Sequence, residues 1–375
     1  MDAELVEAVD TVCDPEALGD LLARPVVATR LRIKPQVSVS AALADACTLE
    51  PWGWVQVLWP RAWSKGRRRG AEAAALGLRR RTVNLGGLHL HAGGVASDPA
   101  LQGVVAARGL TAAVGATDHM RILRHNPLRR LVLADSERVI RLTSLSQYPP
   151  AALETLVAQH CPVPPRLDRG DDPHMSVRAR VGHTDLAGSR DFEAVRRAGT
   201  LLARLHRTPL CEVGAAQVRE LRGRAPDVVA RAHVHANLLD HLAPDLAARV
   251  RALAPCLRPC QGQAVLSHGD ASPDQVLVER GSQATWLTDF DRICVAPPAV
   301  DLGSWVADAG PWSLTPLLEG YAAGGVVVPE QEEMRRGVRS SFVMRLMEPL
   351  RSARPDWRPA LEQRIAHLEE VSACD

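Results

Sequence analysis

The sequence predicts an α+β protein with a smaller, β-rich N-terminal lobe and a larger helical C-terminal lobe. Two observations favour this class. Pairs of short apolar runs joined by Pro-containing turns recur within residues 26–144, as in antiparallel hairpins. Helical periodicity dominates from residue 190 to 266 and again from residue 312. We expect a break between the lobes near residues 175–185. The predicted units are an extra α/β segment over 1–110, an N-terminal lobe over 111–180 and a C-terminal lobe over 181–375.

The composition is that of an ordinary globular protein, with 46% hydrophobic and 23% charged residues. A net charge of +2 and a pI near 8.2 argue against a dedicated nucleic-acid binder. The eight cysteines form no paired C-x-x-C set, which favours reduced thiols. The acidic start MDAELVEAVD lacks the features of a signal peptide, and no apolar run is long enough to span a membrane. We therefore expect a cytoplasmic protein without a nucleic-acid or membrane partner. The oligomeric state stays open.

The N-terminal part contains two passages of similar design. Residues 1–24 have the pattern of a short amphipathic helix interrupted by a proline. ATRLRIKPQVSVSAAL (28–43) with GWVQVLWP (53–60), and MRILRHNPLRRLVLADSERVIRLTS (120–144), each contain an Arg-rich strand, a polar turn with proline and a further strand. We interpret both as hairpins of one N-terminal antiparallel sheet, for which a duplication is one explanation. SKGRRRGAEAAALGLRRR (64–81) predicts a basic helix. A solvated face explains its charges better than phosphate binding.

From residue 150 the sequence pattern changes from paired strands to a mixture of helices and strands. PAALETLVAQHCPVP (150–164) has the pattern of a helix ending before a Pro-rich turn, and HMSVRARVG (174–182) that of one more strand. The segment 189–210 has a clear helical period. Its expected buried face comprises Phe192, Val195, Ala198, Leu201, Leu202 and Leu205.

A group of polar residues stands at the ends of two strand-like runs. VLSHGDASPDQVLV (265–278) places Asp270 after an apolar run, and ATWLTDFDRICVAPPAVDLGSW (284–305) does the same for Asp289. The amide of Gln275 lies between them. Phosphoryl transfer needs these groups, because one carboxylate accepts the proton of the attacking hydroxyl while another carboxylate and an amide oxygen bind Mg²⁺.

Simpler explanations exist for each of these residues alone. An aspartate at a strand end is usually a turn or cap residue, but the joint spacing favours a functional set. Ser272 has no base spaced to activate it, so we interpret it as a loop residue. The His-x-His pairs at 89–91 and 233–235 lack a third ligand nearby, and a metal site at either is disfavoured.

HGDASPDQVLV, TDFD and PAVDLGSW together resemble the aminoglycoside phosphotransferase and choline kinase superfamily, relatives of the protein kinases. The resemblance implies a bilobal protein kinase-like fold that uses ATP or GTP with Mg²⁺. It is strong over residues 266–305 and weak elsewhere within 120–350. The roles it implies are the catalytic base for Asp270, metal ligands for Gln275 and Asp289, and structural support for Asp301 and His268.

Two positions depart from the family pattern. Gln275 stands where Asn is usual, which keeps an amide oxygen on a side chain longer by one methylene. The strand RVIRLTS (138–144) places Arg141 where the family has a phosphate-binding Lys. Arginine keeps the positive charge of the lysine, but its guanidinium group is larger and planar. Glu154, thirteen residues on, is the expected ion-pair partner of Arg141, so both are candidate cofactor-binding residues.

A Gly-rich loop does not precede this strand, and RHNPLRR (124–130) forms the hairpin turn instead. Asn126, Arg129 and Arg130 are candidates for phosphate contacts there. A solvated turn is the interpretation we favour.

Three functions are consistent with this reading. The first is a kinase acting on a hydroxyl of a small molecule, such as an antibiotic or other metabolite, with the adenine edge against residues 175–178. The Arg-rich segment 334–359 speaks against a polycationic acceptor and favours a neutral or acidic one. The second is a kinase of Ser or Thr side chains on a precursor peptide in natural-product biosynthesis. The third is a pseudokinase, which the changes at positions 141 and 275 favour.

Overall fold

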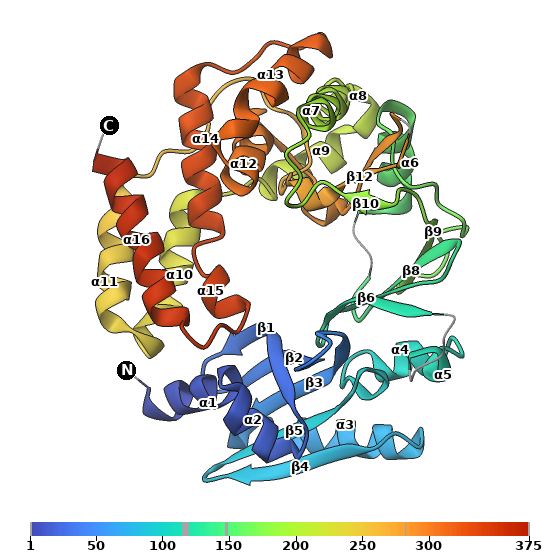
Figure 1. Ribbon diagram of the computed structural model, residues 1–375, viewed down its shortest axis with the longest axis vertical. Coiled ribbons are helices and arrows are strands. Elements are labelled where there is room, and N and C mark those ends of the chain that lie inside the picture. Colours follow the sequence, from blue (N-terminus) through green and yellow to red (C-terminus); the bar gives the residue numbers. More distant parts are fainter. Residues whose placement is uncertain (1, 115–119, 147–148, 282, 374–375) are drawn as a thin grey trace.

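The computed structural model describes residues 2–114, 120–146, 149–281 and 283–373. Figure 1 shows an N-terminal sheet at the bottom, a second sheet at the right, and helices across the top and left. The predicted division into a β-rich N-terminal part and a helical C-terminal part is therefore confirmed. No helix within these residues is long and apolar enough to cross a membrane.

The N-terminal sheet is antiparallel, with strand order β1-β2-β3-β5-β4. Asp2 and Asp14 accept hydrogen bonds from the first backbone N–H groups of the two helices before it. The predicted helix over 1–24 is in this way divided at Pro15. The bounds are α1 (Ala3–Cys13), α2 (Pro15–Leu22), β1 (Val26–Lys34), β2 (Ser38–Asp45), β3 (Pro51–Leu58), α3 (Trp63–Ala75), β4 (Arg80–Leu85) and β5 (Leu88–Gly94).

The second sheet has the order β6-β7-β8-β9 and is also antiparallel. The expectation that both hairpin passages share one sheet is therefore wrong. β5 lies between β3 and β4 and completes the first sheet. β6 pairs with β7 instead, and the second sheet packs on a separate hydrophobic cluster. The bounds are α4 (Gln102–Ala106), α5 (Thr111–Val114), β6 (Arg121–Asn126), β7 (Arg130–Ala134), β8 (Arg138–Thr143), α6 (Ala151–His160) and β9 (Met175–Ala179).

The C-terminal part consists of helices around two small sheets, β10-β12-β13 and β11-β14. α7 buries the predicted apolar face except at Phe192. That ring is 55% exposed and meets Trp312 edge to face. The helices are α7 (Phe192–His206), α8 (Leu210–Val213), α9 (Ala215–Gly223), α10 (Val228–Leu242), α11 (Pro244–Leu253), α12 (Ala299–Ala309), α13 (Leu314–Ala323), α14 (Gln331–Met344), α15 (Glu348–Arg351) and α16 (Trp357–Ala373). The strands are β10 (Thr184–Asp185), β11 (Val265–Ser267), β12 (Val276–Val278), β13 (Thr285–Leu287) and β14 (Cys294–Ala296).

One hydrophobic core joins the N-terminal sheet to the C-terminal helices. Leu5, Val39 and Val57 belong to the same buried cluster as residues of α10, α11, α15 and α16, which lie beside α1 and β1 in Figure 1. The N-terminal segment also contacts β6, because the ring of His125 lies 3.0 Å from Asp98 Oδ2 and both side chains are buried. The segment over 1–110 thus touches both of the other parts.

The crossing of α12 and α14 tests how tightly the helical part is packed. A Cβ on Gly337 would overlap the carbonyl oxygen of Ala299, and one on Gly303 would overlap Gly337 itself. We expect Gly337→Ala to lower the free energy of unfolding by about 1–3 kcal/mol in chemical denaturation. The control Gly70→Ala, in an open position of α3, should stabilise by about 0.5–1 kcal/mol. A Gly337→Ala protein as stable as wild type would contradict this packing.

Candidate active site

The loop before Asp270 is anchored on a fully buried carboxylate. Asp301, in the first turn of α12, accepts hydrogen bonds from the backbone N–H of His268 at 2.6 Å and of Gly269 at 2.7 Å. Nε2 of His206 donates to the same carboxylate at 2.9 Å. Burial acts to raise the pKa of Asp301, but the His206 hydrogen bond, the charges of the histidines and the Gly269 N–H outweigh it and lower that pKa. The loop is therefore held through its backbone.

Local sequence explains the sharp turn that follows β11. Gly269 has a φ of +82°, and a Cβ there would overlap the carbonyl oxygen of Arg292, so only glycine fits. The buried ring of His268 donates from Nε2 to the carbonyl of Thr288 at 2.7 Å. His268 thus connects the loop to the strand end that precedes Asp289.

Two arginines flank the Asp270 carboxylate. Arg345, the residue after α14, approaches one oxygen with Nη2 at 3.3 Å and also pairs with Asp308 at 2.5 Å. Arg292 approaches the other oxygen with Nε at 3.5 Å. Both arginines were missed from the sequence, although Arg292 directly follows the TDFD motif. They orient Asp270 from two sides.

Gln275 lies beside Asp289 because their backbone segments are hydrogen bonded. The carbonyl of Gln275 accepts from the backbone N–H of Thr288 at 2.9 Å and from its hydroxyl at 3.1 Å. The Gln275 side chain is buried, and its Nε2 donates to Asp274 at 3.3 Å. Asp274, which the sequence reasoning did not single out, thus adds a carboxylate to this loop.

Asp289 stands in the left-handed backbone region, with a φ of +59°, between β13 and a short 3₁₀ turn. Three arginines of the second sheet surround it. Arg130 lies at 3.0 Å, Arg124 at 3.7 Å and Arg141 at 4.0 Å. Burial acts to raise the pKa of Asp289, but Arg130 and Arg141 outweigh it and lower that pKa to about 2.

The neighbouring Asp291 shares these partners. It pairs with Arg130 at 2.6 Å and with Arg141 at 2.5 Å. The solvated turn that we favoured from the sequence is therefore wrong for Arg130, whose side chain is 12% exposed. Asp291, the second aspartate of TDFD, was the residue in the sequence that could have indicated these ion pairs with Arg130 and Arg141.

Glu154 has partners other than the expected Arg141. It pairs with Arg166 at 2.6 Å and with Arg178 at 2.5 Å. Each carboxylate oxygen of Glu154 thus accepts a hydrogen bond from one of these two arginines. Arg141 instead contacts Asp289 and Asp291. The predicted Arg141–Glu154 ion pair is not formed in the structure.

The donor set at the end of β13 suits a hard cation. Carboxylate and amide oxygens are the ligands that Mg²⁺ prefers, and Gln275 and Asp289 supply both from adjacent segments. Gln275 and Asp289 are therefore the residues that could hold a metal ion, and Arg124, Arg130 and Arg141 are the cationic groups beside Asp289.

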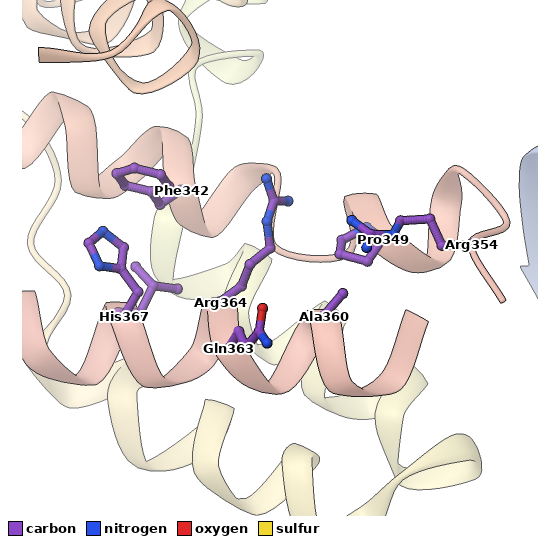
Figure 2. Close-up of a pocket in the computed structure, with 8 residues that line it drawn as sticks. Phe342, Pro349, Arg354, Ala360, Gln363, Arg364 and His367 are labelled. Atoms are coloured by element: carbon purple, nitrogen blue, oxygen red, sulfur yellow. The ribbon is translucent and has the colours of Figure 1, made fainter. Parts of the chain in front are cut away.

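Two cavities lie near the C-terminal helices. The larger, of about 270 Å³, is formed by α14, α15 and α16, and Figure 2 shows Phe342, His367 and Arg364 around it. Asp270, Gln275 and Asp289 do not line it, so we do not assign the transfer reaction to it. A cavity of about 20 Å³ adjoins Asp270 and is lined by Arg292 and Arg345 among others. It has room for about one water molecule.

Comparisons with known proteins identify the family and the fold. A model of the family described as "Phosphotransferase enzyme family" matches residues 111–336. A choline/ethanolamine kinase family protein from Mesorhizobium loti has a similar structure, with a TM-score of 0.51 and 15% identity over 72% of this chain and 94% of that chain. This likeness confirms the bilobal kinase-like fold.

Two further solved structures have lower TM-scores. An ethanolamine kinase of Plasmodium vivax has a TM-score of 0.48 and 12% identity over 67% of this chain and 82% of that chain. A macrolide 2′-phosphotransferase from Brachybacterium faecium has a TM-score of 0.45 and 22% identity over 72% and 97%. A search of curated proteins found no match to this sequence.

The environment of Asp289 predicts a pH-dependent contribution to stability. Its pKa is about 2 in the folded protein, against 3.8 for an ordinary aspartate, so the carboxylate stabilises the fold above pH 4 and loses this effect as the pH falls towards 2. We expect Asp289→Asn to lower the free energy of unfolding by about 2 kcal/mol at pH 6. The difference from wild type should shrink between pH 4 and 2 in urea denaturation. A difference of equal size at pH 6 and pH 2 would contradict this.

Proposed function

Since the chain belongs to the phosphotransferase enzyme family, we propose that it transfers the γ-phosphoryl group of ATP or GTP to a hydroxyl of a small molecule. The observation that carries this proposal is the anchoring of the Asp270 loop on the buried Asp301, which presents Asp270 beside the Asp289 segment. Phosphoryl transfer depends mainly on positioning and charge, and this loop supplies the positioning.

In the proposed reaction, Asp270 accepts the proton of the acceptor hydroxyl. The hydroxyl oxygen forms a bond to the γ-phosphorus, and the bond from that phosphorus to the β–γ bridging oxygen breaks, which releases the nucleoside diphosphate. Arg292 and Arg345 keep the Asp270 carboxylate oriented during proton transfer. Arg124, Arg130 and Arg141 of the second sheet, which surround Asp289, are the groups that we propose for the phosphates.

Gln275 and Asp289 would hold Mg²⁺, which when bound neutralises charge on the nucleotide phosphates. Binding requires that the arginines around Asp289 release it in part. Incoming phosphate oxygens offer those guanidinium groups new partners, so the exchange conserves most charge-assisted hydrogen bonds.

The surroundings of Asp270 bear on the choice of acceptor. Two guanidinium groups within 3.5 Å of this carboxylate disfavour a cationic acceptor and favour a neutral or anionic one. A small molecule is the acceptor class we propose, with a Ser or Thr of a peptide as the alternative.

One observation favours a second candidate, a pseudokinase that binds nucleotide without transfer. Three arginines neutralise Asp289, and a protein in which they never release it would lack a metal ligand. ATP binding in thermal-shift titration without any turnover, including hydrolysis, would select this candidate.

Substitution of Asp270 tests the proposed base. We expect Asp270→Asn to reduce turnover about 10²–10⁴-fold while nucleotide affinity stays close to that of wild type. The measurements are coupled-assay kinetics and nucleotide titration. Asp245→Asn, which changes an exposed carboxylate on α11, is the matched control and should leave turnover unchanged. Full activity of Asp270→Asn would refute the assigned role.

Substitution of Gln275 tests the metal ligand set. Gln275→Ala should raise the Mg²⁺ concentration for half-maximal activity by about 10–100-fold, because an amide oxygen is lost. Gln275→Asn keeps the amide and should stay closer to wild type. If both variants require the same Mg²⁺ concentration as wild type, Gln275 is not a ligand.

A further inference from the structure

The larger cavity, between α14, α15 and α16, combines an apolar lining with an arginine. Phe342, Pro349 and Leu368 supply apolar surface, while Gln363 and Arg364 supply polar groups. Figure 2 shows the side chain of Arg364 extending from α16 into the space between Phe342 and Pro349. Pockets that bind small molecules share this character, a mostly apolar lining with a few polar groups. All lining residues follow residue 336, where the family match ends, so the cavity lies outside the matched region.

The guanidinium group of Arg364 is fixed at one nitrogen and open at the other two. Its Nη1 donates a hydrogen bond to the backbone carbonyl of Arg345 at 2.6 Å. Among the residues that the structure describes, Arg364 has no ion pair, and its Nε and Nη2 have no acceptor. The other arginine of the lining, Arg354, already pairs with Asp356 at 2.6 Å. Arg364 therefore offers the cavity a free pair of parallel donors, which matches a carboxylate.

The surroundings of Arg364 limit the charge of an anion that binds there. Burial lowers the pKa of Arg364, whereas the charge of Glu348, and more weakly that of Asp308, raises it. Both carboxylates have partners of their own, because Glu348 pairs with Arg30 at 3.5 Å and Asp308 with Arg345 at 2.5 Å. They leave the donor pair of Arg364 open but repel a second negative charge. A single carboxylate is therefore favoured over a phosphate dianion.

The size and the rings of the cavity define the rest of the ligand. A volume of about 270 Å³ suits a molecule smaller than a drug-sized ligand. The rings of Phe342 and His367 meet edge to face, with centroids 5.1 Å apart and planes at 78°. Another ring can add to such a pair, because aromatic rings pack well edge to face or with offset stacking. The lining thus fits an aromatic group attached to the carboxylate.

We propose that this cavity is a second ligand site, which binds a small aromatic carboxylate through Nε and Nη2 of Arg364. The site is separate from the proposed transfer site, since Asp270, Gln275 and Asp289 do not line it. The inference therefore goes beyond the transfer function and does not depend on it. The two sites are neighbours, because Arg364 holds the backbone of Arg345, whose side chain lies 3.3 Å from Asp270.

Calorimetric titration of benzoate into the full chain tests this proposal. We expect one saturable site. Benzamide, which keeps the ring without the charge, and acetate, which lacks the ring, should each bind at least about tenfold more weakly. Arg364→Gln should weaken benzoate binding at least about tenfold, because the charge-assisted hydrogen bonds are lost. The matched control Arg358→Gln, at an exposed position of α16, should bind benzoate as wild type does.

Several results would overturn the proposal. These are the absence of saturable benzoate binding, equal binding of benzamide or acetate, and an unchanged affinity of Arg364→Gln. Competition between benzoate and a non-hydrolysable ATP analogue with Mg²⁺ would also overturn it, because benzoate would then occupy the nucleotide site. If Arg364→Gln does not fold, Arg364→Lys replaces it, since lysine keeps the charge but not the parallel donors. Its benzoate affinity should fall at least about threefold, and an unchanged affinity would refute the assigned role of Arg364.

Discussion

The buried Asp301 carboxylate is the interaction on which the rest of the site depends. A carboxylate removed from water is costly unless several donors satisfy it, and here two backbone N–H groups and His206 do so. Tyr321 lies 2.8 Å from the other ring nitrogen of His206 and so joins α13 to the network. Because the donors are the peptides just before Asp270, the same bonds that stabilise the buried charge also set the loop conformation.

The two carboxylates proposed for the reaction have different environments. Asp270 has an arginine on each side and is about one-third exposed, while Asp289 is enclosed by arginines of the second sheet. The first arrangement leaves a face for an incoming hydroxyl. The second keeps a carboxylate ionised in the absence of metal and places cations where phosphates arrive.

Much of the site could be predicted because its central residues lie close together in the sequence. Asp270, Gln275, Asp289 and Asp301 fall within one stretch in which strand ends and turns are readable from local pattern. Their ion-pair partners could not be predicted, since Arg130 lies 159 positions from Asp289 and Arg345 lies 75 positions from Asp270. The two separate sheets were missed for the same reason, because strand pairing at β5 depends on long-range packing rather than on propensity.

The shared core of the N-terminal sheet has a consequence for the family-matched portion of the chain. Residues 111–336 omit both the N-terminal sheet and α15–α16, yet these outer pieces cover the apolar sides of α10 and α11. A fragment containing only residues 111–336 would expose the apolar faces of α10 and α11 to water. In this chain the family-matched region therefore shares its hydrophobic core with both of its flanking segments.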